Sequence, residues 1–235
     1  MDPIGRLKRT ESPALRHALL RTAAAARYAT HGHVVRRRRV RRYLAGTDEP
    51  ALHVGAGPMQ LPGWLNTDLI AGDVQLDVTR RLPFADGSFA YAFGEHLIEH
   101  MPPATGERMI SELARVLRPG GVLRLTTPDL KKIIAIYEDR NPEVSRDDYS
   151  RYLAGLTEKR YEQPAEVFND YLRLWGHHHV YDEADLTARL LANGFSTVVR
   201  AEPGESEHER LRDVERHGGE AWVNRAEAMC LEATR

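Results

Sequence analysis

Short apolar runs separated by glycine-rich turns and helical segments make up the chain from residue 51 onward. This alternation is typical of a parallel sheet covered by helices. The runs that predict strands are residues 51–54, 64–69, 74–78, 89–93, 122–127, 195–200 and 226–233. We therefore expect an α/β fold built on seven strands.

Apolar residues at helical spacing predict the helices between these strands. Residues 105–117 gather their apolar side chains on one side, and the turn Pro119-Gly120-Gly121 ends the pattern. Asp182 has the position of an N-cap for a later helix, which should end at Asn193-Gly194.

Residues 128–176 are longer than a simple crossover and carry three helical patterns rich in aromatic side chains. We expect them to form a helical insertion before the sixth strand. Aromatic residues at such spacings usually form a core. An insertion that follows the carboxyl end of a strand also lies where open α/β sheets bind ligands, so both interpretations stay open.

The first 46 residues differ in charge from the rest of the chain. They carry 12 Lys+Arg against 2 Asp+Glu, whereas the whole chain has a net charge of -1. Ser12-Pro13 predicts the start of one helix, and a second should run through the arginines to Leu44. We expect a basic helical extension over residues 1–46 and one α/β domain over residues 47–235.

The arginine run at residues 36–42 could meet an acidic partner, a phosphate-bearing substrate or the acidic body of the same chain. Its six arginines cannot share one helix face, and no aromatic residues suited to base stacking interleave them. We therefore favour a helix that caps the domain and do not expect a nucleic-acid partner.

Cys230 is the only cysteine, which excludes an internal disulfide, a multi-cysteine zinc site and an iron–sulfur cluster. The sequence carries neither a secretory apolar region nor an apolar run of membrane-spanning length. We expect a cytoplasmic protein without a membrane partner, and leave open whether it forms homo-oligomers.

Three successive predicted strands end in residues able to contact a ligand. Gly55-Ala56-Gly57 ends the first in a turn where missing Cβ atoms let a ligand approach the backbone. Asp68 ends the second and could accept hydrogen bonds from both hydroxyls of a ribose. Asp77 ends the third and could accept from an adenine amino group, with the backbone of Val78 beside it. Three such strand ends in succession are unlike a chance pattern.

Four stretches carry a resemblance to a known family. They are LHVGAGPMQLPGWLNTDL, GDVQLDVTRRLPFADGSFAYAFGEHLIEH, ELARVLRPGGVLRLTTPDL and HHHVYDEADLTARLLANGFSTVV. On these stretches, and over about residues 50–200, the chain resembles the class I S-adenosylmethionine-dependent methyltransferases, in particular small members with a Gly-Trp-x-Asn-x-Asp second strand. The resemblance implies a Rossmann-like fold with seven strands.

The resemblance also implies a cofactor and a set of site residues. S-adenosylmethionine would lie with its methionine part over Gly55, Ala56 and Gly57, its ribose on Asp68, and its adenine on Asp77 and Val78. Glu95 and His96 follow the fourth strand, where they would face the sulfonium and the substrate. They are the candidate catalytic residues, and Glu95 would also contact the cofactor. One departure is that only 11 positions separate Gly57 from Asp68, too few for the usual full helix.

The acceptor is expected to be a small molecule. The fourth strand is not followed by Asn-Pro-Pro-Tyr or Asp-Pro-Pro-Tyr, and the cysteine needed for cytosine C5 chemistry is missing. We expect O-methylation in a biosynthetic pathway, in which His96 could take the proton of a hydroxyl acceptor; a carboxylate acceptor needs no base. The alternatives are an enzyme that binds the cofactor without methylating, and a non-catalytic cofactor-binding or partner-binding module.

Histidines elsewhere invite a metal interpretation. His177, His178 and His179 cannot all reach one ion from an extended strand, because neighbours face opposite sides. His100 lies four residues after His96, so the two histidines could act as a pair of general bases or as metal ligands. The simpler interpretation is that His100 is a histidine on the surface of a helix. We expect no metal site, and take His178 as a candidate substrate contact.

Overall fold

The computed structural model describes residues 33–216 and 221–235. One seven-stranded sheet has the order β3-β2-β1-β4-β5-β7-β6, with β7 antiparallel to both of its neighbours. This is the expected Rossmann-like α/β fold. The strands are β1 (Ala51–Val54), β2 (Leu65–Asp68), β3 (Val74–Gln75), β4 (Phe89–Glu95), β5 (Leu117–Pro128), β6 (Thr197–Ala201) and β7 (Ala228–Thr234).

Every predicted strand has a counterpart in the structure, but several strands begin or end at other residues than predicted. The third strand is only two residues long and ends at Gln75, so Asp77 follows the strand and does not end it.

The helices are α3 (His33–Leu44), α4 (Pro103–Val116), α5 (Leu130–Tyr137), α6 (Arg146–Thr157), α7 (Pro164–Tyr171), α8 (Glu183–Ala192) and α9 (Ala221–Glu227), with short 3₁₀ turns η1 (Ile98–His100), η2 (Leu174–Gly176) and η3 (Glu209–Leu211).

The main core lies between the sheet and helices α4 and α8. Met109 and Leu113 of α4 and Leu186 of α8 are buried in one cluster with side chains of the central strands. The Asp182 side chain accepts a hydrogen bond from the backbone N–H of Asp185, which confirms the predicted N-cap of α8.

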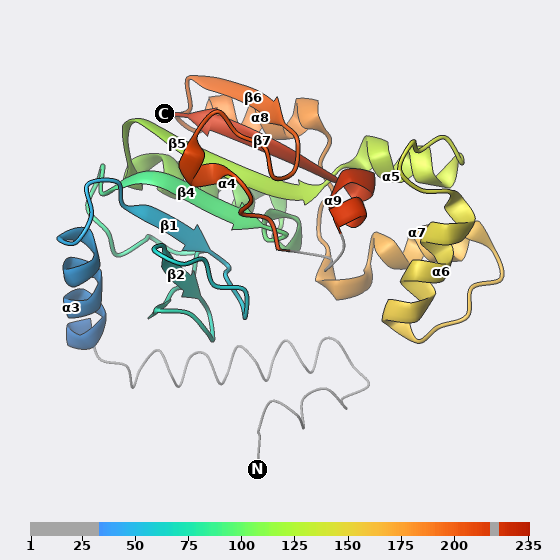
Figure 1. Ribbon diagram of the computed structural model, residues 1–235, viewed down its shortest axis with the longest axis horizontal. Helices are drawn as coiled ribbons and strands as arrows, with labels where there is room; N and C mark the ends of the chain where they lie inside the picture. The colour runs from blue at the N-terminus through green and yellow to red at the C-terminus, as the bar shows by residue number, and fades with distance from the viewer. Residues whose placement is uncertain (1–32, 217–220) are drawn as a thin grey trace, which may run out of the picture.

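Helix α3 docks on the domain at the end opposite to the insertion (Figure 1). The Tyr43 hydroxyl donates to the carbonyl of Ala51 and accepts from its N–H, both at 2.9 Å. This confirms the predicted second helix through the arginines and places it against the start of β1. The helix predicted to begin at Ser12 lies outside the described residues.

The insertion after β5 forms helices α5, α6 and α7, beyond the carboxyl ends of β1, β4 and β5 (Figure 1). Tyr149, Phe168 and Tyr171 join aliphatic side chains in a separate small core between these helices. The interpretation of the aromatic residues as core is therefore confirmed for this set.

Residues 202–216 are held against the sheet by a buried arginine. The side chain of Arg124 on β5 is fully buried and pairs at 2.6 Å with both Glu215 and Glu232. It also donates to the carbonyls of Glu202 and Glu205. Breaking one of these ion pairs would leave a buried charge unpaired, so the network fixes this segment beside the carboxyl end of β4.

Within the described part of the chain, none of the helices has the length and apolar character needed to cross a bilayer.

Candidate active site

A cavity of about 560 Å³ opens at the carboxyl ends of β1 and β4. It lies where open α/β sheets bind ligands. The described residues that line it are His53, Gly55, Ala56, Gly57, Pro58, Met59, Glu95, His96, His100, Tyr152, Leu153, Leu156, Tyr171, Trp175, His177 and Glu227.

The turn after β1 forms one side of this cavity. Gly55 and Gly57 have φ values of 68° and 50°, a left-handed conformation that glycine adopts without strain. A Cβ added at Gly55 would lie 3.0 Å from Leu97, whereas one added at Gly57 would meet no atom within 4 Å. Gly57 therefore leaves open the space in which a ligand can approach the backbone.

The loop after this turn contains no helix, as the short spacing predicts. Its shape comes from Asn66, whose side chain accepts from the N–H of Leu61 at 2.8 Å and donates to the carbonyl of Leu61 at 3.0 Å. His53 contacts the same Asn66 oxygen at 3.1 Å, so the loop is tied to both β1 and β2.

Asp68 ends β2, as predicted, but its carboxylate already serves the backbone. One oxygen accepts from the N–H groups of Ile70 and Ala71, and the other accepts from the N–H of Gly57 at 3.2 Å. Asp68 thereby links the glycine turn to the loop after β2. It is not among the cavity-lining residues, and a carboxylate has about four acceptor sites, so some capacity for a ribose hydroxyl is left.

Asp77 and Val78 lie after β3 and outside the lining of the cavity. The Asp77 carboxylate caps its own turn, because it accepts from the N–H of Thr79 at 3.0 Å and pairs with Arg80 at 3.0 Å. The side chain of Val78 is part of the main core. For the adenine contacts expected from the sequence, this leaves the backbone of Val78 and the lone pairs of the Asp77 carboxylate that its own turn does not use.

Glu95 and His96 line the cavity at the end of β4. Both carboxylate oxygens of Glu95 accept from the backbone N–H of Arg216, at 3.0 and 2.9 Å. His96 has a φ of 45°, which a residue with a side chain adopts only at a cost of order 1–3 kcal/mol. Backbone strain of this kind often occurs at functional sites. In this protein the strained residue lies where the chain leaves β4 and approaches η1.

His96 pairs with Glu99, a residue that the sequence analysis missed. Its Nδ1 lies 3.3 Å from Oε1 of Glu99, while the other Glu99 oxygen accepts from the Thr127 hydroxyl at 2.9 Å. Burial would lower the pKa of His96, but the interaction with Glu99 outweighs it and the pKa is raised. Burial would likewise raise the pKa of Glu99, but His96 outweighs it and the pKa is lowered.

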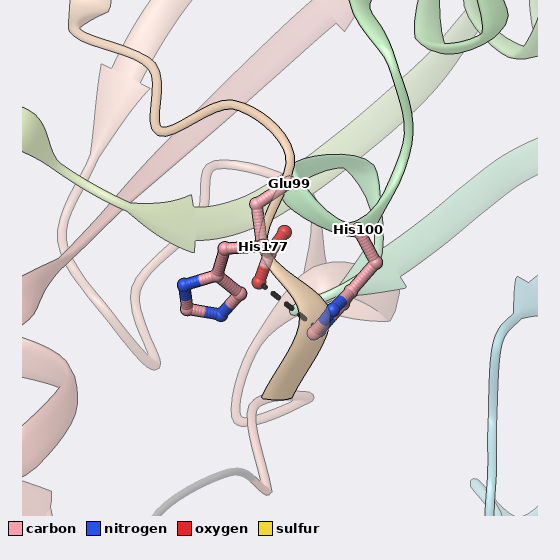
Figure 2. Close-up of side chains that lie close together, drawn as sticks. All are labelled: Glu99, His100 and His177. Atoms are coloured by element: carbon pink, nitrogen blue, oxygen red, sulfur yellow. Dashed lines mark ion pairs between the residues drawn. The ribbon is translucent and has the colours of Figure 1, made fainter. Parts of the chain in front are cut away.

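Two further imidazoles lie beside Glu99 (Figure 2). His100 and His177 have ring centroids 4.9 Å apart, and Nε2 of His100 lies 4.0 Å from the Glu99 carboxylate. Burial lowers the pKa of His177 to about 4 and also lowers the pKa of His100. We call the four residues His96, Glu99, His100 and His177 the acid–imidazole cluster.

The histidine segment faces the cavity through His177 and not through His178. His178 is exposed and absent from the lining, and its backbone N–H takes part in the site by donating to the Glu99 carbonyl at 2.7 Å. His179 pairs with Asp185 of α8 at 2.8 Å. Alternation along the segment excluded a shared role for all three, but could not say which one faces the site.

The insertion supplies an apolar side of the cavity, which we call the apolar wall. Leu156 and Trp175 are exposed to 57% and 44%, which is high for large apolar side chains at the edge of a cavity. This finding joins the two interpretations left open from the sequence, because the insertion has its own core and also lines the cavity. The apolar wall consists of Tyr152, Leu153, Leu156, Tyr171 and Trp175.

Residues 52–125 match the family model described as a methyltransferase domain. The match runs from β1 into β5 and so contains the glycine turn, Glu95 and His96. No curated protein matches the chain.

Among solved structures, the chain is similar to a methyltransferase complexed with the Trm112 methyltransferase activator of Haloferax volcanii, at 12% identity over 92% of this chain and 96% of that one, with a TM-score of 0.47. It is also similar to S-adenosylmethionine-dependent methyltransferases of Archaeoglobus fulgidus (15% identity, 84% and 91% covered, TM-score 0.46) and Mesorhizobium loti (15%, 83% and 96%, 0.44). Similarity at these identities and TM-scores gives no information about the acceptor or the partners of this chain.

The family match over residues 52–125 and the order of the strands agree with the class I S-adenosylmethionine-dependent methyltransferase resemblance found in the sequence. The matched domain makes the chain a methyltransferase, with S-adenosylmethionine as its cofactor. The match identifies neither the acceptor nor the residues that hold the cofactor, and it does not test the Gly-Trp-x-Asn-x-Asp pattern of the second strand.

Proposed function

We propose that this enzyme methylates an oxygen atom of a small acceptor that has an apolar portion. The observation that supports this best is the composition of the cavity, in which the glycine turn, the three histidines of the acid–imidazole cluster and the apolar wall meet around one space of about 560 Å³. A volume of this size suits a small molecule. A nucleic-acid acceptor is not favoured, because the arginines of α3 lie at the opposite end of the domain (Figure 1).

The cofactor fits the glycine turn, where Gly57 leaves free the space that a Cβ would fill. We assign its methionine part to Gly55, Ala56 and Gly57, its ribose to Asp68, and its adenine to Asp77 and Val78. The bound cofactor supplies an electrophilic methyl group on its sulfonium. The protein then has to hold the acceptor oxygen in line with that group and keep water away, which can provide much of the acceleration.

Two polar residues at the end of β4 are assigned to the acceptor side. His96 lines the cavity with its ring fixed by Glu99, so we give it the hydrogen bond to the acceptor oxygen. Both carboxylate oxygens of Glu95 accept from the backbone N–H of Arg216, so we assign Glu95 the role of holding residues 202–216 beside the end of β4, in addition to its expected cofactor contact. His178 is not retained as a substrate contact, because it is exposed and outside the lining.

The biological setting follows the sequence expectations. We propose that the acceptor is an intermediate of a biosynthetic pathway in the cytoplasm, and that residues 1–46 form a basic extension to a catalytic domain over residues 47–235. The docking of α3 on the domain through Tyr43 supports a capping role for at least the second part of that extension.

A methyl-transfer screen tests the proposal. The full chain is incubated with S-adenosylmethionine labelled in its methyl group and with matched acceptors that share an apolar ring and differ only in carrying a hydroxyl, carboxylate, amine or thiol. We expect transfer to the hydroxyl or carboxylate compounds. Preferential transfer to the amine, or to tRNA and protein in place of small molecules, would contradict it.

A further inference from the structure

We propose that Glu99, His100 and His177 bind one divalent first-row transition-metal ion, such as Zn²⁺, at the cavity side of η1. Two imidazoles and one carboxylate are a ligand set that catalytic zinc sites use, with the remaining positions open to water or substrate. His100 and His177 also line the cavity, so the open positions would face the space assigned to the acceptor.

The positions of the ligand atoms support this site. One nitrogen from each imidazole and one Glu99 oxygen all lie within 4.8 Å of one another, and the three side chains point toward a common space (Figure 2). Tetrahedral zinc with bonds of about 2.1 Å needs ligand atoms about 3.4 Å apart. Small rotations of the two rings would close this gap.

The backbone holds the two contributing segments together. The N–H groups of His178 and His179 donate to the Glu99 carbonyl at 2.7 and 3.2 Å, which fixes the segment after η2 onto η1. The ligands are therefore brought together from distant parts of the sequence by hydrogen bonds that do not involve the ligand atoms.

The surroundings of Glu99 and His100 also suit a metal ion. Glu99 is completely buried, and its Oε1 makes no well-aligned hydrogen bond, since His96 Nδ1 lies 3.3 Å away and His100 Nε2 lies 4.0 Å away. Thr127 orients the carboxylate through its other oxygen. Backbone groups of Trp175 and Gly176 act as hydrogen-bond partners of the His100 ring, an arrangement that commonly orients a metal-bound histidine.

The spacing of the histidines alone would point to a different site. His96, Glu99 and His100 have the H-x-x-E-H spacing in which two histidines of one helix bind zinc. Here the segment is a single 3₁₀ turn, and His96 turns onto Glu99. The structure brings His177 into the group in place of His96.

An ion at this site would extend the proposed function, on which this part of the inference rests. A metal ion can lower the pKa of a bound hydroxyl and hold its oxygen, so it would both orient and activate a hydroxyl acceptor.

The test is direct metal binding by the full chain, prepared without a histidine tag and freed of metal by a chelator. Titration calorimetry with Zn²⁺ and absorption spectra with Co²⁺ should show one tight site per chain with a low-symmetry, four- or five-coordinate cobalt spectrum. His177→Ala should weaken Zn²⁺ binding at least tenfold and remove that spectrum. His178→Ala is the matched control, since it removes the neighbouring exposed imidazole, and should change neither.

Circular dichroism and S-adenosylhomocysteine binding are measured on the same samples. Equal Zn²⁺ affinity of the parent protein and folded His177→Ala, or no stoichiometric binding by the parent, would overturn the metal site and leave a metal-free hydrogen-bond network. Glu99→Gln provides a second reading, because it keeps the shape of the side chain and should also weaken Zn²⁺ binding. Intact metal binding together with methyl transfer only to nitrogen would overturn the proposed function and leave the metal site in place.

Discussion

The two sides of the cavity are built in different ways. The side that we assign to the cofactor is the turn after β1, and the bond from its Gly57 N–H to Asp68 at the end of β2 joins residues only 11 positions apart. The side that we assign to the acceptor joins Glu99 of η1 to Thr127 of β5, 28 positions away, and to His177 after η2.

This difference separates what is common to a fold from what is particular to a protein. A turn that leaves space for a ligand beside a strand end depends on glycine conformation and on parallel strand geometry, which many sequences can share. The acceptor side depends on which insertion a chain carries and how it packs, so it is where substrate choice is expected to reside. Variants on the two sides should therefore change different measured quantities.

Gly57→Val should have the largest effect and act on the cofactor side alone. A branched side chain would enter the space beside the turn, and φ of 50° is costly for valine. We expect S-adenosylhomocysteine affinity to fall at least a hundredfold in calorimetry. The gain in melting temperature that a ligand selective for the native state produces should disappear with it.

Gly120→Val is the matched control for this variant. Gly120 also has a positive φ, of 77°, and an added Cβ there would also meet nothing within 4 Å, but it lies in the first part of β5 and outside the cavity lining. The control should lose a similar amount of stability and keep its affinity. Equal affinities in the two variants would show that the glycine turn does not hold the cofactor.

Asp68→Ala should reduce cofactor affinity by about ten- to a hundredfold, because charge-assisted hydrogen bonds to the ribose are worth about 1.5–3 kcal/mol. The structure adds an expected loss of stability, since the same carboxylate accepts from Gly57, Ile70 and Ala71. Asp68→Asn keeps an acceptor oxygen for the loop and removes the charge. If Asp68→Asn binds S-adenosylhomocysteine normally and Asp77→Asn does not, the ribose assignment has to move.

The sequence was sufficient for most of the fold because apolar periodicity and turn residues are local. It predicted all seven strands of the sheet, the N-cap at Asp182 and the insertion after β5. It misplaced the end of the third strand, because the apolar pattern continues through Leu76 and Val78 after pairing with β2 has stopped at Gln75. Burial in the core produces the same apolar pattern as a strand.

The sequence was less informative about the acceptor side, for a physical reason. His96 and Glu95 could be noticed as residues after a strand, but Glu99 gave no local sign that it would be completely buried and paired with His96. His177 could be separated from His178 only through the backbone bonds that fix their segment to η1. Contacts between distant segments decide both points, and no local pattern encodes them.

His96→Gln should act on the acceptor side and leave the cofactor side unchanged. If His96 holds the acceptor oxygen, KM for the acceptor should rise about tenfold with a smaller change in kcat, whereas loss of a general base would lower kcat by about 10²–10⁴. Steady-state kinetics with the acceptor from the screen separates the two. His208→Gln, which lies against Tyr91 outside the cavity lining, is the control, and a normal kcat and KM in His96→Gln would remove His96 from the site.

Leu156→Ala should have the smallest effect and is the most specific test of the apolar wall. The side chain is 57% exposed at the cavity, so its truncation costs little folding stability but removes apolar area from a bound acceptor. A loss of about 1 kcal/mol corresponds to about a fivefold rise in KM, and S-adenosylhomocysteine affinity should not change. Leu191→Ala on α8 is the matched control, because Leu191 is 47% exposed and does not line the cavity. An acceptor KM that responds equally to both variants, or to neither, would mean that the insertion does not contact the acceptor and that the difference between the two sides of the cavity lies in the acid–imidazole cluster alone.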